Sequence, residues 1–247
     1  MSFSVTILGS SGMFATRERA CAGYLLDVGD KIWVDAGSGT WRNLLDHVSY
    51  QELDGIILTQ RHPDHTTDVL QAYHARQYGQ AQSLPVIPLW APQETLDALS
   101  SFSKELDNAF ELRAVSGGDS VELGNATIRF IEMAHPGETF GVRVEMDGGV
   151  LAYSSDTGDG ADFESLARGA DVFICEATSQ DSDELWEGHM RASQTGAVAH
   201  RLGVKRLILT HLRPGRDHQR TLNEAKAAAP DIAIELASDG TRLEVGR

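Results

Sequence analysis

The sequence predicts an α/β (α+β) protein in which two mixed sheets pack face to face with helices outside, a four-layer αββα sandwich. Short apolar runs typical of strands recur along the 247 residues, and each ends in a turn signal. Hairpin-like strands come first, strands then alternate with segments of helical spacing, and a similar mixture returns in the second half. Because no Pro-, Gly- or Ser-rich linker separates the halves, we expect a single domain over 1–247.

The expected strands are either continuously apolar or alternate between apolar and polar residues. Two of them contain a strong hairpin signal, at Gly29-Asp30 and at Asp147-Gly148. The strand segments are 5–12, 23–37, 53–60, 84–92, 125–135, 139–158, 171–179, 205–212 and 233–245.

Segments of helical spacing lie between the strands, and the last two of them carry Ala, Leu and Val at three- and four-residue spacing, which gives one apolar face each. Pro92 stands near the start of the segment 92–109, where proline is tolerated. The helical segments are 38–48, 65–78, 92–109, 161–169, 191–203 and 217–229.

The balance of charged residues limits which substrates are expected. The chain has 36 acidic and 21 basic residues and a formal net charge of −15. Proteins that bind long nucleic acids usually present a basic face, because phosphate neutralisation supplies much of their affinity. The composition therefore disfavours a long nucleic acid as partner without forbidding it.

Compartment signals are few. The N-terminus lacks the features of a signal peptide, and no run approaches the roughly 18 apolar residues needed to cross a bilayer. Two cysteines, Cys21 and Cys175, are too few for a disulfide framework and fit a reducing compartment. We expect a cytoplasmic protein with no membrane partner.

Histidine and aspartate residues gather where four of the expected strands end. They are His62, Asp64 and His65 in LTQRHPDHTTD, His135 in FIEMAHPGET, Asp156 in LAYSSDTGD, and His211 in LILTHLRP. Taken alone, the first three could be ordinary loop residues. A sheet places its strand ends side by side, however, so all six can converge, and imidazole and carboxylate groups are suitable ligands for zinc and similar ions. The sequence therefore predicts a metal site.

This pattern resembles the metallo-β-lactamase superfamily, and within it the ribonuclease Z-like phosphodiesterases. That family has His-x-His-x-Asp-His, then a lone His, an Asp in a Ser-Gly-Asp-Thr-like turn, and a late His. The stretches EAT at 176–178 and HMRAS at 189–193 look like the family's Glu-x-Thr and His-Ser/Thr elements. The resemblance covers almost the whole chain, and relatives in this branch are often homodimers.

The resemblance implies two metal ions that share Asp156. The further ligands would be His62 and His135 for one ion, and Asp64, His65 and His211 for the other. Zinc is the expected metal, one or two ions per chain, with manganese or another divalent metal as the alternative.

One residue departs from the family pattern. Gln60 stands where the family has its first histidine, and a neutral amide oxygen suits harder ions than zinc. We therefore expect one strong and one weakened metal site, with Gln60 either a weak fourth contact or no ligand at all.

The resemblance also implies catalytic roles. A metal-bridging hydroxide would attack the substrate, and Asp64 could accept the proton of the water. His189, held by Glu176, would protonate the leaving group, and His189 and Ser193 would contact the substrate. The alternative for His189 is a solvated loop histidine.

The expected substrate is a small phosphodiester such as a cyclic nucleotide. Ribonuclease Z carries a basic tRNA-clamping arm, but a single hairpin fills the space between His135 and Asp156, so we expect no arm. The chain is similar to short bacterial members that act on cyclic nucleotides. Three alternatives stay open: a tRNA 3′-processing endonuclease, a lactone or thioester hydrolase, and a catalytically weak binding protein with a degraded metal site.

Overall fold

The computed structural model describes residues 3–80, 84–184 and 186–246, and within these ranges the strands form two seven-stranded sheets. The first sheet has the order β14 (Arg242–Val245), β1 (Phe3–Gly9), β2 (Gly23–Asp27), β3 (Lys31–Ala36), β4 (Gly55–Ile57), β5 (Ile87–Ala91) and β6 (Phe110–Ala114). The second has the order β13 (Ala233–Leu236), β12 (Arg206–Thr210), β11 (Val172–Glu176), β10 (Gly149–Tyr153), β9 (Phe140–Met146), β8 (Ala126–Glu132) and β7 (Ser120–Leu123).

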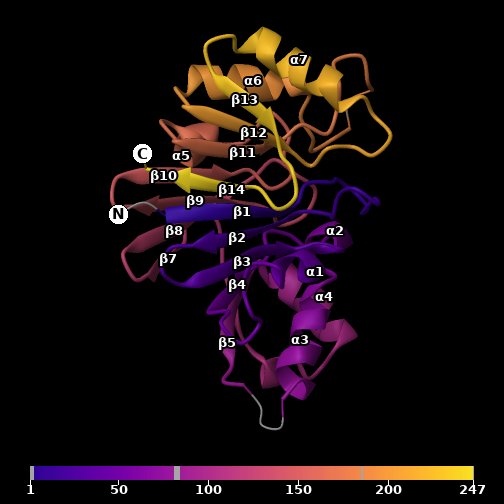
Figure 1. The fold of residues 1–247 in the computed structure, drawn as a ribbon, viewed down its shortest axis with the longest axis vertical. Helices are drawn as coiled ribbons and strands as arrows, with labels where there is room; N and C mark the ends of the chain where they lie inside the picture. Colours follow the sequence, from indigo (N-terminus) through magenta and orange to yellow (C-terminus); the bar gives the residue numbers. More distant parts are fainter. Residues whose placement is uncertain (1–2, 81–83, 185, 247) are drawn as a thin grey trace.

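Helices cover the outer faces of both sheets, so the layers are helix, sheet, sheet, helix (Figure 1). On the first sheet lie α1 (Thr40–Leu44), α2 (Pro63–Thr66), α3 (Val69–Tyr78), α4 (Gln93–Phe102) and the 3₁₀ turn η1 (Leu106–Asn108). On the second lie α5 (Phe163–Ala167), α6 (Ala192–Arg201) and α7 (His218–Ala228). The predicted αββα sandwich is confirmed.

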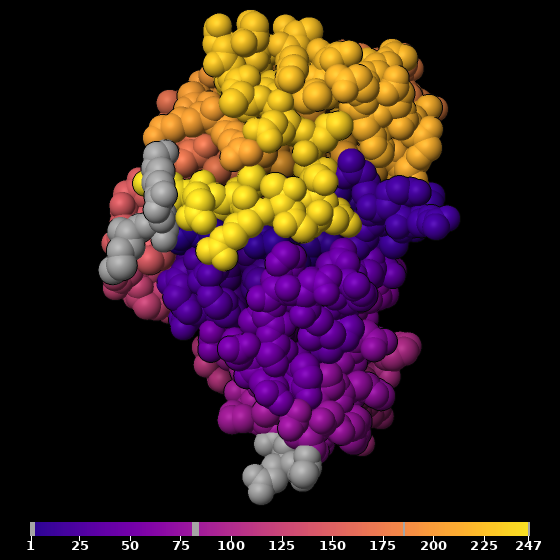
Figure 2. Space-filling model, in the orientation of Figure 1, coloured from indigo at the N-terminus to yellow at the C-terminus, as the bar shows by residue number. Residues whose placement is uncertain are grey.

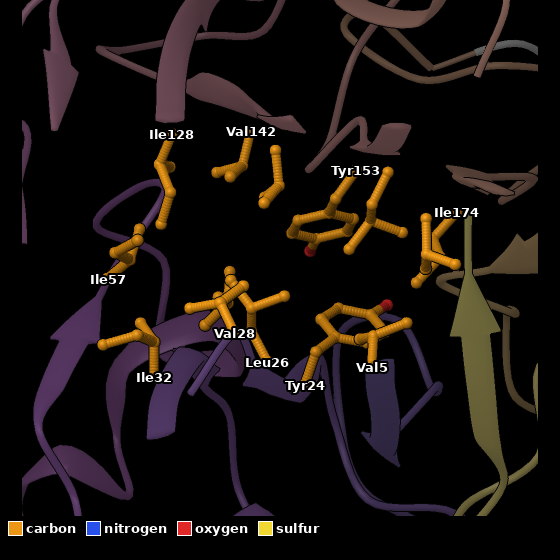
Figure 3. Close-up of a cluster of buried hydrophobic side chains, with 14 of the residues drawn as sticks. Val5, Tyr24, Leu26, Val28, Ile32, Ile57, Ile128, Val142, Tyr153 and Ile174 are labelled. Carbon is orange, nitrogen blue, oxygen red and sulfur yellow. The ribbon is translucent and has the colours of Figure 1, made fainter. Parts of the chain in front are cut away.

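The central core lies between the two sheets. In Figure 3, Ile32 and Ile57 of the first sheet face Ile128 and Val142 of the second. The next residue of β3, Trp33, points outward and packs under the helices, as the two-residue period of a strand requires. Strands buried on both faces must be apolar throughout, which explains the continuous apolar runs.

The two halves of the chain gather toward opposite ends of the molecule, but the last strand returns to the first sheet. β14 pairs antiparallel with β1, Val245 opposite Phe3. Figure 2 shows this C-terminal segment, in yellow, crossing beside the indigo N-terminal strand. No helix among the described residues is long and apolar enough to cross a membrane.

Both predicted hairpins are present. β2 and β3 pair antiparallel around Gly29-Asp30, and β9 and β10 around Asp147-Gly148. Asp147 and Gly148 both have positive φ, 50° and 81°, as a two-residue turn that matches the twist of the strands demands.

Two strands were not predicted, and two expected helices are divided. β6 and β7 lie at the sheet edges and expose most of their side chains, so they lack an apolar run. The segment 65–78 contains the end of α2 and all of α3, and 92–109 contains α4 and η1. Periodicity alone does not locate the chain reversals that divide them.

The parallel strands decide where the site lies. β3 to β6 run parallel to one another, and so do β10 to β13. β8 runs in the same direction as β10, because both are antiparallel to β9. The carboxyl ends of β4, β8, β10 and β12 therefore carry the segments that meet at the site.

Candidate metal centre

The six residues predicted from the strand ends lie together. Their ligand atoms form compact groups, each with all atoms within 4.8 Å of one another. Two of the groups consist of these residues alone: His62, His135 and Asp156, and Asp64, His65 and His211. A third combines Asp156 and His211 with His189. The first two match the ligand sets implied by the resemblance, with Asp156 central.

A short helix positions the residues that follow β4. His62 is the N-cap of α2 and Pro63 its first residue, where the fixed φ of proline suits a helix start. His65 is thereby turned inward and is fully buried. The helix lies close against the loop after β3, since a Cβ on Gly37 would lie 2.0 Å from the carbonyl oxygen of Asp64.

His65 is oriented by a buried carboxylate that the sequence analysis missed. The His65 Nδ1 atom lies 2.8 Å from Asp35 Oδ2, and Asp35 also accepts hydrogen bonds from Thr59 and from the Tyr153 hydroxyl. Asp35 lies at the carboxyl end of β3, and the predicted ligands likewise lie where their strands end. The same strand-end signal was therefore present in the sequence. With Nδ1 engaged, His65 turns Nε2 toward Asp156, 3.3 Å away.

His135 and His211 are held in the same way. His135 Nδ1 lies 2.9 Å from the carbonyl oxygen of Gly188. His211 Nδ1 lies 2.8 Å from Thr178 Oγ1, whose hydroxyl donates to Glu176 and so leaves the oxygen to accept. In both residues Nε2 faces the cluster.

The donor set fits divalent ions. Histidine ligands typically engage one ring nitrogen in a hydrogen bond and present the other to the metal. Two nitrogen or oxygen ligands on a tetrahedral zinc ion lie about 3.3–3.4 Å apart. His62 Nδ1 and His135 Nε2 are 3.3 Å apart, and His211 Nε2 is 3.2 Å from Asp64 and 3.3 Å from Asp156.

Buried polar atoms support the same conclusion. His65 Nε2 and Asp156 Oδ1 are buried and make no hydrogen bond of suitable geometry among the described residues, although each lies 3.3 Å from a charged neighbour, Asp156 Oδ2 and His211 Nε2 respectively. Leaving such atoms unpaired costs about 1–3 kcal/mol each. A bound cation satisfies both, so the residues present fit a divalent metal.

Without metal, the cluster is a set of coupled charges. Burial alone would raise the pKa of Asp156, but the charges of His211 and His65 hold it well below its usual value. Burial would lower the pKa of His211, but Asp156 and Asp64 raise it to about 9. Burial and the neighbouring His135 lower the pKa of His62.

Gln60 points into the cluster and is buried. Its Nε2 donates a 2.7 Å hydrogen bond to Asp156 Oδ2, and its Oε1 has no partner among the described residues. The amide nitrogen cannot ligate a metal ion, and its hydrogen bond holds Asp156 in place.

Glu176 and His189 form a pair beside the cluster. His189 Nδ1 lies 2.9 Å from Glu176 Oε1, and the fully buried Glu176 also accepts from the backbone of Thr157 and Met190. Burial would lower the pKa of His189, but the hydrogen bond and charge of Glu176 raise it. The His189 ring stacks on that of His211, with centroids 5.5 Å apart.

Ser193 is placed differently. It lies in the first turn of α6, and its hydroxyl donates to Asp181 Oδ1 at 2.6 Å. That hydrogen bond joins α6 to the loop before it, and a contact of Ser193 with the substrate stays a prediction.

Comparison with known proteins agrees with this geometry. The family described as the beta-lactamase superfamily domain matches residues 30–212. The uncharacterized protein Rv1339 of Mycobacterium tuberculosis is 32% identical over all of this chain and 94% of its own length. Ribonuclease Z of Methanopyrus kandleri is 27% identical over 97% of each chain.

A probable metallo-hydrolase, YhfI of Bacillus subtilis, is 28% identical over 90% of this chain and 92% of its own. The crystal structure of YhfI, described as a metallo-beta-lactamase fold protein, superposes with a TM-score of 0.90 at 26% identity, covering 99% of this chain and 100% of that one. The protein therefore belongs to the metallo-β-lactamase superfamily and is a metal-dependent hydrolase with ribonuclease Z-like relatives.

Proposed function

We propose that the protein is a phosphodiesterase that hydrolyses a small phosphodiester such as a cyclic nucleotide. The observation that supports this proposal is the Glu176–His189 pair, whose imidazole stacks on His211 beside the ligand cluster, where it would act as a proton donor. Phosphodiesters and lactones both lose an alkoxide, but at phosphorus it departs in the same displacement as the attack, whereas at a lactone carbonyl it departs only after the nucleophile has added. A proton donor beside the leaving oxygen therefore assists the displacement at phosphorus more directly. The pair therefore favours phosphodiesters over carbon esters.

Divalent ions, which we propose to be zinc, would be held by His62, His135 and Asp156 and by Asp64, His65 and His211. Asp156 could serve both ions, since His65 Nε2 and His211 Nε2 each lie 3.3 Å from one of its oxygens. When bound, they would supply a water-derived nucleophile at neutral pH and offset the charge that builds on the phosphate. Asp64 would hold the attacking water and accept its proton, as the resemblance implies.

His189 would supply the proton to the leaving oxygen. Its raised pKa favours the protonated imidazole, and Glu176 fixes the ring through Nδ1, so that Nε2 is the atom able to donate. A positioned general acid contributes roughly 10²–10⁴-fold to the rate.

A small substrate is supported by two features. The connection between His135 and Asp156 is formed by β9 and β10 with a tight turn at Asp147-Gly148, so we propose that the chain carries no tRNA-clamping arm. The net charge of −15 opposes a long polyanion. Ribonuclease Z among the relatives keeps tRNA 3′ processing as the second candidate.

The test is a turnover assay of the purified protein with zinc, manganese or magnesium. Its substrates are cyclic AMP, bis(p-nitrophenyl) phosphate, a precursor tRNA and a lactone. We expect metal-dependent hydrolysis of the two small diesters. Cleavage of the precursor tRNA alone would favour the tRNA endonuclease. Hydrolysis of the lactone alone would favour the carbon-ester hydrolase, and inactivity with every metal would favour a binding protein. We also propose a homodimer, which light scattering of the same sample checks.

A further inference from the structure

An exposed aromatic ring lies beside His189, on the outer side of the Glu176–His189 pair. Trp186 is 38% exposed, and its ring centroid lies 6.3 Å from that of His189 in an edge-to-face arrangement. At the rim of a polar site, this ring offers a ligand an apolar surface next to charged residues.

A cationic side chain lies over the Trp186 indole ring. The guanidinium carbon of Arg213 lies 4.2 Å from the Trp186 ring centroid. Arg216 and Arg220, on the same segment, pair with Asp183 and Glu224. Arg213 has no carboxylate partner in the ranges that the structure describes, although the protein carries a net charge of −15. The guanidinium is therefore available to a ligand.

The two residues come from segments that are held together. Arg213 follows His211 by two residues, and Trp186 precedes His189 by three. Between the segments, Arg216 pairs with Asp183 at 3.0 Å, and Gln180 Nε2 donates to the carbonyl oxygen of Asp217 at 2.7 Å. Trp186 and Arg213 thus belong to two segments that this ion pair and this hydrogen bond join.

We propose that the Trp186–Arg213 pair binds the nucleobase of a nucleotide substrate by stacking. This inference rests on the proposed phosphodiesterase function and names its substrate class. Aromatic rings and guanidinium planes are the surfaces on which proteins stack bases, and such stacking accepts any base because each has a π-face. The pair then recognises the nucleoside, while the ligand cluster and His189 act on the phosphate.

The test measures ligand affinity, not turnover. Calorimetry on the metal-loaded protein compares 5′-AMP with ribose 5-phosphate, which lacks the base. Stacking on one aromatic residue corresponds to roughly 5- to 150-fold in affinity. We expect the wild-type protein to prefer 5′-AMP by a factor in this range, and Trp186→Ala to reduce that preference toward unity.

Three variants keep the test specific. Trp186→Phe retains a ring and should keep most of the preference, whereas Arg213→Lys keeps the charge without the plane and should lose part of it. Phe102→Ala removes another exposed aromatic side chain, at the end of α4, and should bind both ligands as the wild type does.

The outcomes separate this inference from the function on which it rests. Equal or absent binding of the two ligands by the wild type, or an equal loss of both in Trp186→Ala, overturns the stacking site. If the small diesters are hydrolysed in that case, the phosphodiesterase proposal stands alone. A preference for 5′-AMP that depends on Trp186 supports the stacking site even if no diester is hydrolysed.

Discussion

At the scale of single residues, the site depends on how each imidazole is held. His65, His135 and His211 each engage Nδ1 with an oxygen acceptor and turn Nε2 inward. This arrangement fixes which nitrogen can bind a metal before any metal arrives. The protein thus supplies preorganised ligands.

The raised pKa of His211 makes the stability of the metal-free protein depend on pH. The ordinary histidine pKa is 6.5, and His211 has a pKa of about 9 when folded. Its proton therefore stabilises the fold fully below pH 6.5, and this contribution is lost as the pH rises through 9. Chelated protein should melt at progressively lower temperature between pH 7 and pH 9.

In metal-loaded protein the stabilisation by the metal should increase with pH, because the metal replaces the His211 proton and binds more tightly as that proton leaves. The melting-temperature difference between loaded and chelated samples should therefore widen over the same pH range. A constant difference would contradict the assignment of His211 as a ligand.

His189→Ala should lower kcat for cyclic AMP by about 100-fold or more, since a general acid is lost. The loss should be much smaller for bis(p-nitrophenyl) phosphate, because p-nitrophenolate leaves without a proton. Glu176→Gln should show the same dependence on the leaving group in weaker form. An equal loss on both substrates would mean that His189 only supports the structure of the site and does not donate a proton.

The sequence was sufficient to predict that these six residues cluster, because each follows an apolar strand. It was insufficient for their supporting contacts. Thr59 and Tyr153, which hydrogen-bond to Asp35, come from different sheets, and no local pattern reports such a pairing. The hydrogen bond from Gln60 to Asp156 was hidden for the same reason.

At the scale of elements, the strands and hairpins of the core were predicted because burial on both faces demands apolar residues. The edge strands β6 and β7 were missed because their exposed residues meet no such demand. The division of 65–78 into α2 and α3 was missed as well. That division matters, since α2 turns His65 inward.

The approach of α2 to the loop after β3 can be tested with Gly37→Ala. The new methyl would meet Asp64 O at 2.0 Å and Ala22 O at 2.7 Å, so α2 must move. We expect a loss of about 1–3 kcal/mol in the free energy of unfolding, as for other overpacked sites, and weaker metal retention. Denaturant titration and elemental analysis measure these effects.

Gly160→Ala serves as the matched control, because its new methyl would come no closer than 3.8 Å to Ala134. It should retain metal as the wild type does. Wild-type metal retention in Gly37→Ala would show that the position of α2 does not control the site.

At the scale of the whole molecule, function follows from two sheets that present their strand ends at one edge. β4 belongs to the first sheet, and β8, β10 and β12 to the second. The ligand groups therefore combine residues from both sheets, and the core between the sheets fixes their separation. The geometry of the candidate metal centre therefore depends on how the two sheets pack.

The most direct test of this account is the metal content of the wild-type protein beside that of Gln60→His. After treatment with a chelating resin, the wild type should retain about one equivalent of zinc and the variant closer to two, because an imidazole completes the weakened site. Complete removal of metal should abolish diester hydrolysis, and added zinc should restore it. Two tightly held equivalents in the wild type would contradict the weakened site, and undiminished hydrolysis by the stripped protein would contradict the metal centre itself.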